Sequence, residues 1–183
     1  MVLKSLKFIF PMAAMAGMLI SVPASAHIDL LTPAPLLDGK AMDYKALKSP
    51  PFGAPGVDVR AAPAATVKAG SVIEVRAEVY VYHPGEIVVL YTTDLAGGDI
   101  EPAWSIPDQG AEIPHYNLLY KGPVPDPEDT NIFEARVQLP DTPGVIILVV
   151  RQVMHDKFDV MEDGSVSLRR VYYHQGAKLK LVR

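Results

Sequence analysis

Apolar and polar residues alternate along several short stretches of the chain, which is the pattern of β-strands. Residues 71–82 (SVIEVRAEVYVY) alternate over most of their length and are rich in β-branched and aromatic side chains. After His83-Pro84-Gly85 the chain resumes as IVVLYTT at 87–93, so these stretches predict strand, turn and strand. Residues 132–139 alternate in the same way, and 145–154 (VIILVVRQVM) form an apolar run that predicts a central strand buried on both faces.

Further stretches complete the expected sheet. Residues 167–173 and 177–182 are expected to close the domain, and HIDLL at 27–31 is a candidate short strand. Apolar and basic residues alternate within 177–182, so one face of that strand is expected to be exposed to solvent. No apolar stripe of helical period is evident, and 36–64 and 94–131 are long connections without an obvious strand pattern. The pattern predicts an all-β fold, an antiparallel immunoglobulin- or fibronectin-III-like β-sandwich with long loops.

The first 26 residues follow a different pattern. Lys4 and Lys7 precede an apolar run over 8–22, and Ala24-Ser25-Ala26 follows as an A-x-A site, which is typical of a secretory signal peptide. We therefore expect residues 1–26 to be cleaved off. The mature product would be one domain over 27–183, periplasmic or secreted, with no membrane anchor.

The charge and the cysteine content of the chain limit which partners, nucleophiles and metal sites it can have. The chain has 17 basic and 21 acidic residues, and the loss of Lys4 and Lys7 leaves 15 against 21, or a net charge of −6. Such a surface argues against nucleic acid as a partner. The absence of cysteine excludes disulfides, a thiolate nucleophile and cysteine-ligated metal. No G-x-S-x-G or phosphate-loop motif supports covalent hydrolysis or nucleotide binding, and we expect a monomer.

The expected cleavage makes His27 the first residue of the mature chain. A terminal histidine offers its α-amine and its imidazole Nδ1 to one metal ion. His83, at the end of a predicted strand, could supply a second imidazole, and three nitrogens in a T-shaped arrangement suit copper best. The alternatives are an incidental terminal histidine at 27 and a structural histidine at 83.

Other residues compete for a further role at such a site. The remaining histidines are His115, His155 and His174, and for each alone a solvated or hydrogen-bonded side chain is the simpler interpretation. Because neighbouring strand residues point to opposite faces, Tyr173 and His174 can face one site together only across a bulge. Asp156 and Glu86 could bind a metal or orient a histidine, but nothing in their spacing selects either.

In order and spacing, these segments resemble a bacterial group of secreted proteins similar to lytic polysaccharide monooxygenases. The resemblance rests on HIDLLTP (27–33), KSPPFG (48–53), EVYVYHPG (78–85), QVMHDK (152–157) and YYHQGA (172–177). It implies an immunoglobulin-like sandwich with a copper histidine brace. In that brace His27 supplies amine and imidazole and His83 the second imidazole, while His174 or Tyr173 approaches the axial side.

The chain also departs from the family pattern. The family has cysteines where this chain has Phe52 and Gly176, and further cysteines near Pro143 and Ile146. Loss of whole disulfides with apolar or small replacements is compatible with an intact fold. The departure therefore bears on the activity more than on the fold.

The resemblance implies a copper-dependent oxidoreductase that cleaves glycosidic bonds of a polysaccharide, with Tyr173 limiting access at the axial position. Trp104, Tyr116 and Tyr120 are the aromatic candidates for a polysaccharide-binding surface, although they could equally anchor loops in the core. A second hypothesis is a non-catalytic periplasmic copper-binding or copper-delivery protein with a copper-handling partner protein. A third is a sandwich that binds no metal. The candidates for the axial side are His174, Tyr173 and His155. An imidazole there would favour the non-catalytic copper protein, and a phenol would favour the oxidoreductase.

Overall fold

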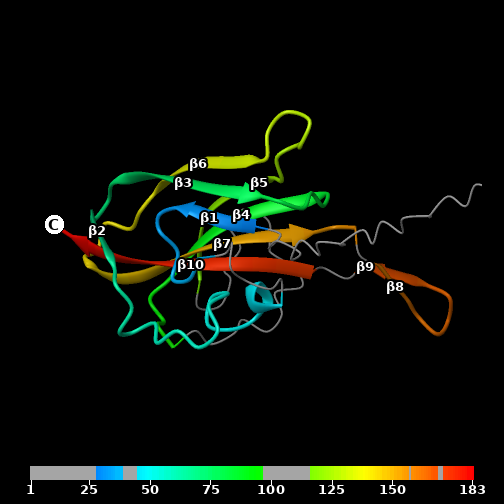
Figure 1. The fold of residues 1–183 in the computed structure, drawn as a ribbon, viewed down its shortest axis with the longest axis horizontal. Coiled ribbons are helices and arrows are strands. Elements are labelled where there is room, and N and C mark those ends of the chain that lie inside the picture. The colour runs from blue at the N-terminus through cyan, green and yellow to red at the C-terminus, as the bar shows by residue number, and fades with distance from the viewer. Residues whose placement is uncertain (1–27, 39–44, 97–115, 157, 169–170) are drawn as a thin grey trace, which may run out of the picture.

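The computed structural model describes residues 28–38, 45–96, 116–156, 158–168 and 171–183, and within them the fold is built from β-strands (Figure 1). The strands are β1 (Ile28–Thr32), β2 (Ala65–Lys68), β3 (Val72–Val79), β4 (Gly85–Thr92), β5 (Asn117–Pro123), β6 (Ile132–Gln138), β7 (Gly144–Met154), β8 (Phe158–Val160), β9 (Val166–Leu168) and β10 (Val171–Val182). One short 3-10 helix, η2 (Ala46–Lys48), is the helical element of the described part. The predicted all-β class is confirmed.

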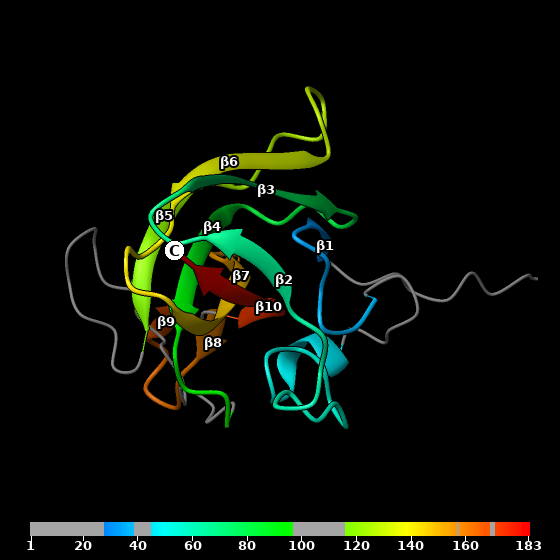
Figure 2. The same cartoon turned by 90° about the vertical axis from the view of Figure 1, so that its left-hand side faces the viewer.

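Two sheets pack face to face as a sandwich (Figure 2). The smaller sheet has the order β1-β3-β6 and the larger one the order β2-β10-β7-β4-β5. All pairs within them are antiparallel except β2 with β10, which is parallel. The predicted antiparallel sandwich is therefore confirmed, with one parallel pair at the edge of the larger sheet.

The larger sheet is apolar on both faces. Its inner face, toward the smaller sheet, carries Ile146, Leu148 and Val150 of β7, whereas Ile147 and Val149 belong to a second cluster on the outer face. Residues 45–62, which we call the cover segment, contribute to this outer cluster and shield it from solvent. The prediction that 145–154 is a strand buried on both faces is confirmed.

The predicted wet face of the last strand is wrong at one position. Lys180 is exposed, but Lys178 on the same face is only 9% exposed. Its Nζ donates hydrogen bonds to the carbonyl oxygens of Arg60 and Ala62, at 2.6 and 2.8 Å. Alternation alone predicts that a basic residue at this position is solvated. The cover segment instead supplies carbonyl acceptors that make burial of the ammonium group possible.

Phe52 and Gly176 occupy neighbouring positions between the cover segment and β10. The Gly176 amide donates to the Phe52 carbonyl at 2.9 Å, and a Cβ added at Gly176 would lie 2.7 Å from the Phe52 Cβ. Next to them, a Cβ at Gly53 would lie 1.9 Å from the carbonyl oxygen of His174. Glycine is therefore required at both positions for the cover segment to approach the sheet closely.

Five strands differ from the expectations. The connection 94–131 contains β5, and β2 follows the connection 36–64, which contains η2. The stretch 167–173 divides between β9 and β10, and β10 then continues without a break through 177–182. β8 was not expected. β5 and β2 are edge strands with partly exposed residues, so their sequences lack the clean alternation of the central strands.

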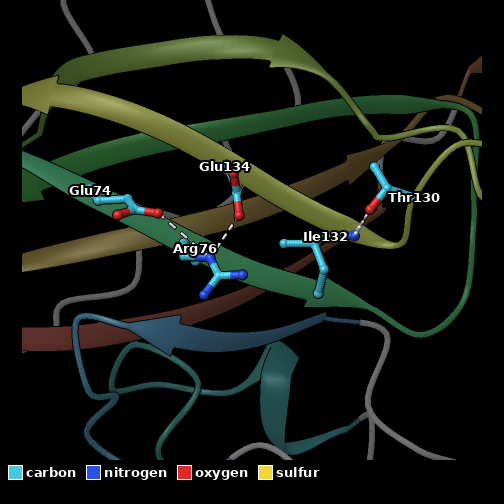
Figure 3. A network of polar contacts seen from close by, with 5 residues as sticks. All are labelled: Glu74, Arg76, Thr130, Ile132 and Glu134. Carbon is cyan, nitrogen blue, oxygen red and sulfur yellow. Dashed lines mark hydrogen bonds and ion pairs between the residues drawn. The ribbon is translucent and has the colours of Figure 1, made fainter.

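Two features complete the surface. On the outer face of the smaller sheet, Arg76 Nε lies 2.8 Å from Glu134 Oε1 and 3.6 Å from Glu74 Oε1, and nearby Thr130 accepts a hydrogen bond from the Ile132 amide (Figure 3). At one end the β8–β9 hairpin, whose strands pair with each other, projects beyond the sandwich (Figure 1).

No helix among the described residues is both long and apolar enough to span a membrane. The predicted signal peptide, residues 1–26, lies outside the described ranges.

Candidate metal site

One end of the sandwich gathers the segments that carry the predicted metal-binding residues. In β1 and β3, Ile28 pairs with Val79, and the turn after β3 carries His83. In the larger sheet, Met154 pairs with both Gly85 and Val171, so the end of β7 lies between the starts of β4 and β10. All these segments lie at the right-hand end of the sandwich in Figure 1. His27, which precedes β1, lies outside the described residues.

His83 is held by a carboxylate. Its Nδ1 lies 2.8 Å from Oδ2 of Asp156, and the side chains are 15% and 29% exposed. The turn that carries His83 is joined to the end of β7 by a second contact, because the amide of His155 donates to the Pro84 carbonyl at 2.8 Å. Of the two acids that the sequence offered for orienting a histidine, Asp156 thus contacts His83. With Nδ1 occupied by the carboxylate, Nε2 is the ring nitrogen able to take a metal.

Tyr173 lies on the inner face of the larger sheet. Its ring is buried in the cluster between the sheets, which also contains Ile28, Val79 and Met154 from the same end of the sandwich. The ammonium group of Lys48, from η2, lies 4.7 Å from the centre of the Tyr173 ring. The phenol is therefore on the face of β10 toward which β1 packs.

Two buried glutamines that the sequence analysis missed share this inner face. Gln152 pairs with Tyr173 across β7 and β10, and its Nε2 donates to the Val81 carbonyl at 3.3 Å. Gln175 accepts a hydrogen bond from the Leu30 amide. These side chains tie the turn after β3 and strand β1 to the larger sheet. Gln152 is a polar residue inside an apolar run. That pattern could have indicated its role, because a buried side-chain amide normally forms hydrogen bonds.

His174 lies on the opposite, outer face. It is 2% exposed, its Nε2 lies 3.3 Å from the Ser49 carbonyl, and its ring stacks on Tyr172 at 5.4 Å between centres. The guanidinium group of Arg151 lies over the Tyr172 ring, with its Cζ 4.3 Å from the ring centre. Burial, and secondly the Arg151 charge, lower the pKa of His174 to about 3, so the imidazole is neutral at neutral pH. The pairing of β10 with β7 is unbroken here, so Tyr173 and His174 face opposite sides, as the alternation predicts.

The remaining candidates are distributed around the site. His155 Nε2 lies 3.7 Å from Glu86, whose carboxylate also binds Lys121 at 3.0 Å. Tyr116 is buried in the outer cluster, and Tyr120 packs against Phe133 with ring centres 5.5 Å apart. Tyr116 is thus a core residue, as the alternative interpretation held, and Tyr120 is partly buried against the core. His115 and Trp104 lie outside the described residues.

Within the described ranges, no three His, Asp or Glu side chains converge on a point where they could hold a metal ion. The predicted partner of His83 is His27, which lies outside this part of the chain. The described residues bring His83, an imidazole backed by a carboxylate, to this end, and His155 lies at the same end beside Glu86. That combination fits a metal that prefers nitrogen ligands.

Comparison with known proteins adds similar folds at low sequence identity. No family model and no curated protein sequence matches the chain. Among solved structures, a chitin binding domain from Burkholderia pseudomallei is 13% identical over 85% of this chain and 99% of its own, with a TM-score of 0.49. A lytic polysaccharide monooxygenase from Thermobia domestica is 14% identical over 73% of this chain and 76% of its own, with a TM-score of 0.45.

A monooxygenase of the same kind from Streptomyces lividans is 13% identical over 65% of this chain, with a TM-score of 0.39. The chain spans 59% of the length of that protein and 61% of the length of a further polysaccharide monooxygenase.

Proposed function

We propose that this chain is an exported histidine-brace copper protein that oxidises the glycosidic bonds of a polysaccharide. His27, exposed by cleavage after Ala26, would supply its α-amine and imidazole, and His83 would supply Nε2. The observation that carries the proposal is the contact of 2.8 Å between His83 Nδ1 and Asp156, at the end of the sandwich where β1 begins. Metal-binding histidines commonly donate their second ring N–H to a carboxylate in this way.

The chemistry of the donors selects the metal. The three neutral nitrogens that His27 and His83 would supply favour copper by ligand type and by affinity order. When bound, copper would supply one-electron redox chemistry that activates oxygen or peroxide against a C–H bond of the polysaccharide. The protein's own contribution is rigidity, because Gln175 ties β1 to β10 and Gln152 ties the His83 turn to β7.

Of the two candidates on β10, we propose that Tyr173 rather than His174 would face the copper site. Tyr173 shares the inner face with Ile28, the first residue of β1, whereas the His174 ring is buried on the outer face beneath Ser49. For His174 to face the same side, β10 would have to turn over, which would break its pairing with β7. A phenol near the copper would limit access without adding a further strong ligand, which suits a catalytic role.

The second candidate is a non-catalytic copper-binding or copper-delivery protein with a protein partner. It is favoured by one specific observation: Tyr116 is buried in the core and Tyr120 is partly buried against it, so neither is an exposed aromatic side chain. Both candidates share His27 and His83 as copper ligands. They differ in the group that would occupy the remaining position and in whether reduced copper reacts productively with peroxide in the presence of a glycan.

The test of copper binding is titration of protein that begins at His27, followed by electron paramagnetic resonance. We expect one tightly bound Cu(II) with nitrogen coordination. His83→Ala should weaken binding by orders of magnitude, because an in-plane ligand is lost. His155→Ala is the matched control, since this histidine lies at the same end but contacts Glu86, and it should bind copper as the wild type does. Equal affinity of wild type and His83→Ala would contradict the brace.

The test of activity uses the same copper-loaded protein with ascorbate and peroxide on cellulose and chitin. Oxidised oligosaccharides that disappear in His83→Ala would support the polysaccharide oxidoreductase. Tight copper binding without such products on either glycan would favour the copper-delivery candidate.

A further inference from the structure

We infer that Asp156 is a positioning residue that fixes His83 in the tautomer able to bind metal through Nε2. The inference rests on the proposed copper function for its consequence. Its physical basis is the geometry of the pair, in which His83 Nδ1 lies 2.8 Å from Asp156 Oδ2.

The proton between the two groups belongs to the imidazole. An ionised carboxylate has acceptors only, so the contact is a hydrogen bond only when Nδ1 carries the hydrogen. Neutral imidazole has one N–H, and the hydrogen on Nδ1 leaves the lone pair on Nε2. Asp156 therefore selects the ring nitrogen that is offered to a metal.

The pair is held together by strand ends that are separate in sequence. Gly85 and Met154 are direct partners in β4 and β7, and the His155 amide donates to the Pro84 carbonyl. These bonds place the residue before Pro84 beside the residue after His155. The backbone bonds therefore hold the carboxylate and the imidazole within contact of each other. Both side chains are mostly shielded from water.

Among the described residues, two neighbouring acids lie in other surroundings. Glu86, the nearest acid along β4, binds Lys121 at 3.0 Å and lies 3.7 Å from His155. Asp159, in β8 of the projecting hairpin, is exposed and pairs in register with Ser167. Asp159 offers a matched control, because its removal changes the net charge of the same region by the same amount.

The carboxylate also changes the imidazole as a ligand. A hydrogen bond from Nδ1–H to a negative group pushes electron density toward Nε2 and makes it a stronger donor. A stronger donor stabilises Cu(II) relative to Cu(I), so Asp156 should lower the reduction potential of copper bound to His83. Asparagine at 156 could still accept the hydrogen bond but would lack the charge, which separates orientation from charge.

The first experiment uses metal-free protein that begins at His27, and nitrogen NMR to determine the tautomer of neutral His83. In wild type and Asp156→Asn we expect the hydrogen on Nδ1. In Asp156→Ala we expect a shift toward hydrogen on Nε2, and in Asp159→Ala no change. A His83 that keeps its Nδ1–H in Asp156→Ala would overturn the inference.

The second experiment measures Cu(II) affinity and the copper reduction potential of the same four proteins. Asp156→Ala should weaken Cu(II) binding by roughly 10–100-fold. Asp156→Asn should bind more tightly than Asp156→Ala but show a higher potential than wild type, and Asp159→Ala should match wild type. Unchanged affinity and potential in Asp156→Ala would also overturn the inference.

The two proposals can fail separately. If wild type binds no copper, the proposed function fails, and the tautomer of metal-free His83 still decides whether Asp156 positions it. If wild type binds copper but the tautomer and affinity do not respond to Asp156, only the positioning role fails. Thermal unfolding of each variant verifies the fold. If Asp156→Ala is destabilised, the copper reduction potential of Asp156→Asn, which should lie above that of wild type, still tests the effect of the carboxylate.

Discussion

At the scale of single residues, His174 has an environment that keeps its imidazole neutral. The ring is buried between Tyr172 and the Ser49 carbonyl, and the Arg151 guanidinium lies over the Tyr172 ring. A second positive charge in this place would be desolvated and repelled, which explains why its pKa falls to about 3. His174 therefore fastens the cover segment to the sheet as a neutral group.

This environment predicts a pH-dependent stability. Unfolded His174 binds a proton near pH 6.5, whereas the folded residue does so only near pH 3, so the unfolded state gains protons first as the pH falls. The contribution of His174 is complete above pH 6.5 and is lost progressively toward pH 3, by roughly 1 kcal/mol per pH unit. Urea unfolding at pH 7, 5 and 4 should show a smaller loss in His174→Gln. Parallel pH profiles for the two proteins would refute this.

At the scale of elements, the cover segment is fastened to β10 by a buried ammonium group. Lys178 Nζ holds the carbonyls of Arg60 and Ala62, so Lys178→Met would keep the packing of the stem but leave two acceptors without their donor. We expect a loss of about 1–3 kcal/mol in the free energy of unfolding and faster tryptic cleavage after Arg60.

Lys180→Met is the matched control, because Lys180 lies two residues farther along the same strand face and is exposed. Its unfolding and its cleavage after Arg60 should resemble those of the wild type. Equal cleavage rates in the Lys178 and Lys180 variants would show that the ammonium group does not hold the segment.

At the scale of the whole molecule, the proposed copper ion would join the start of the chain to the turn after β3. Binding to the folded state alone stabilises it, by about 2.7 kcal/mol when free copper is 100 times Kd. For a domain of this size that corresponds to a rise in Tm of roughly 5–10 °C. We expect this rise in protein that begins at His27. A glycine placed before His27 converts the amine into an amide and should abolish most of it, and equal rises in both proteins would argue against terminal coordination.

The sequence by itself determined the central strands and the class of fold. β3, β4, β6 and β7 were predictable because alternation and β-branched runs are local properties that a buried strand requires. The two candidate ligands, His27 and His83, also came from local context, one from a cleavage motif and the other from a strand end.

Only the tertiary structure decided which side chains meet. His83 and Asp156 are 73 residues apart, and Leu30 and Gln175 are 145 apart, so no local pattern relates them. The edge strands and the burial of Lys178 were not predictable either, because they depend on what a distant segment places against the sheet. Alternation required Tyr173 and His174 to face opposite ways, but only the packing of β1 and the cover segment determined which of them lies toward the candidate site.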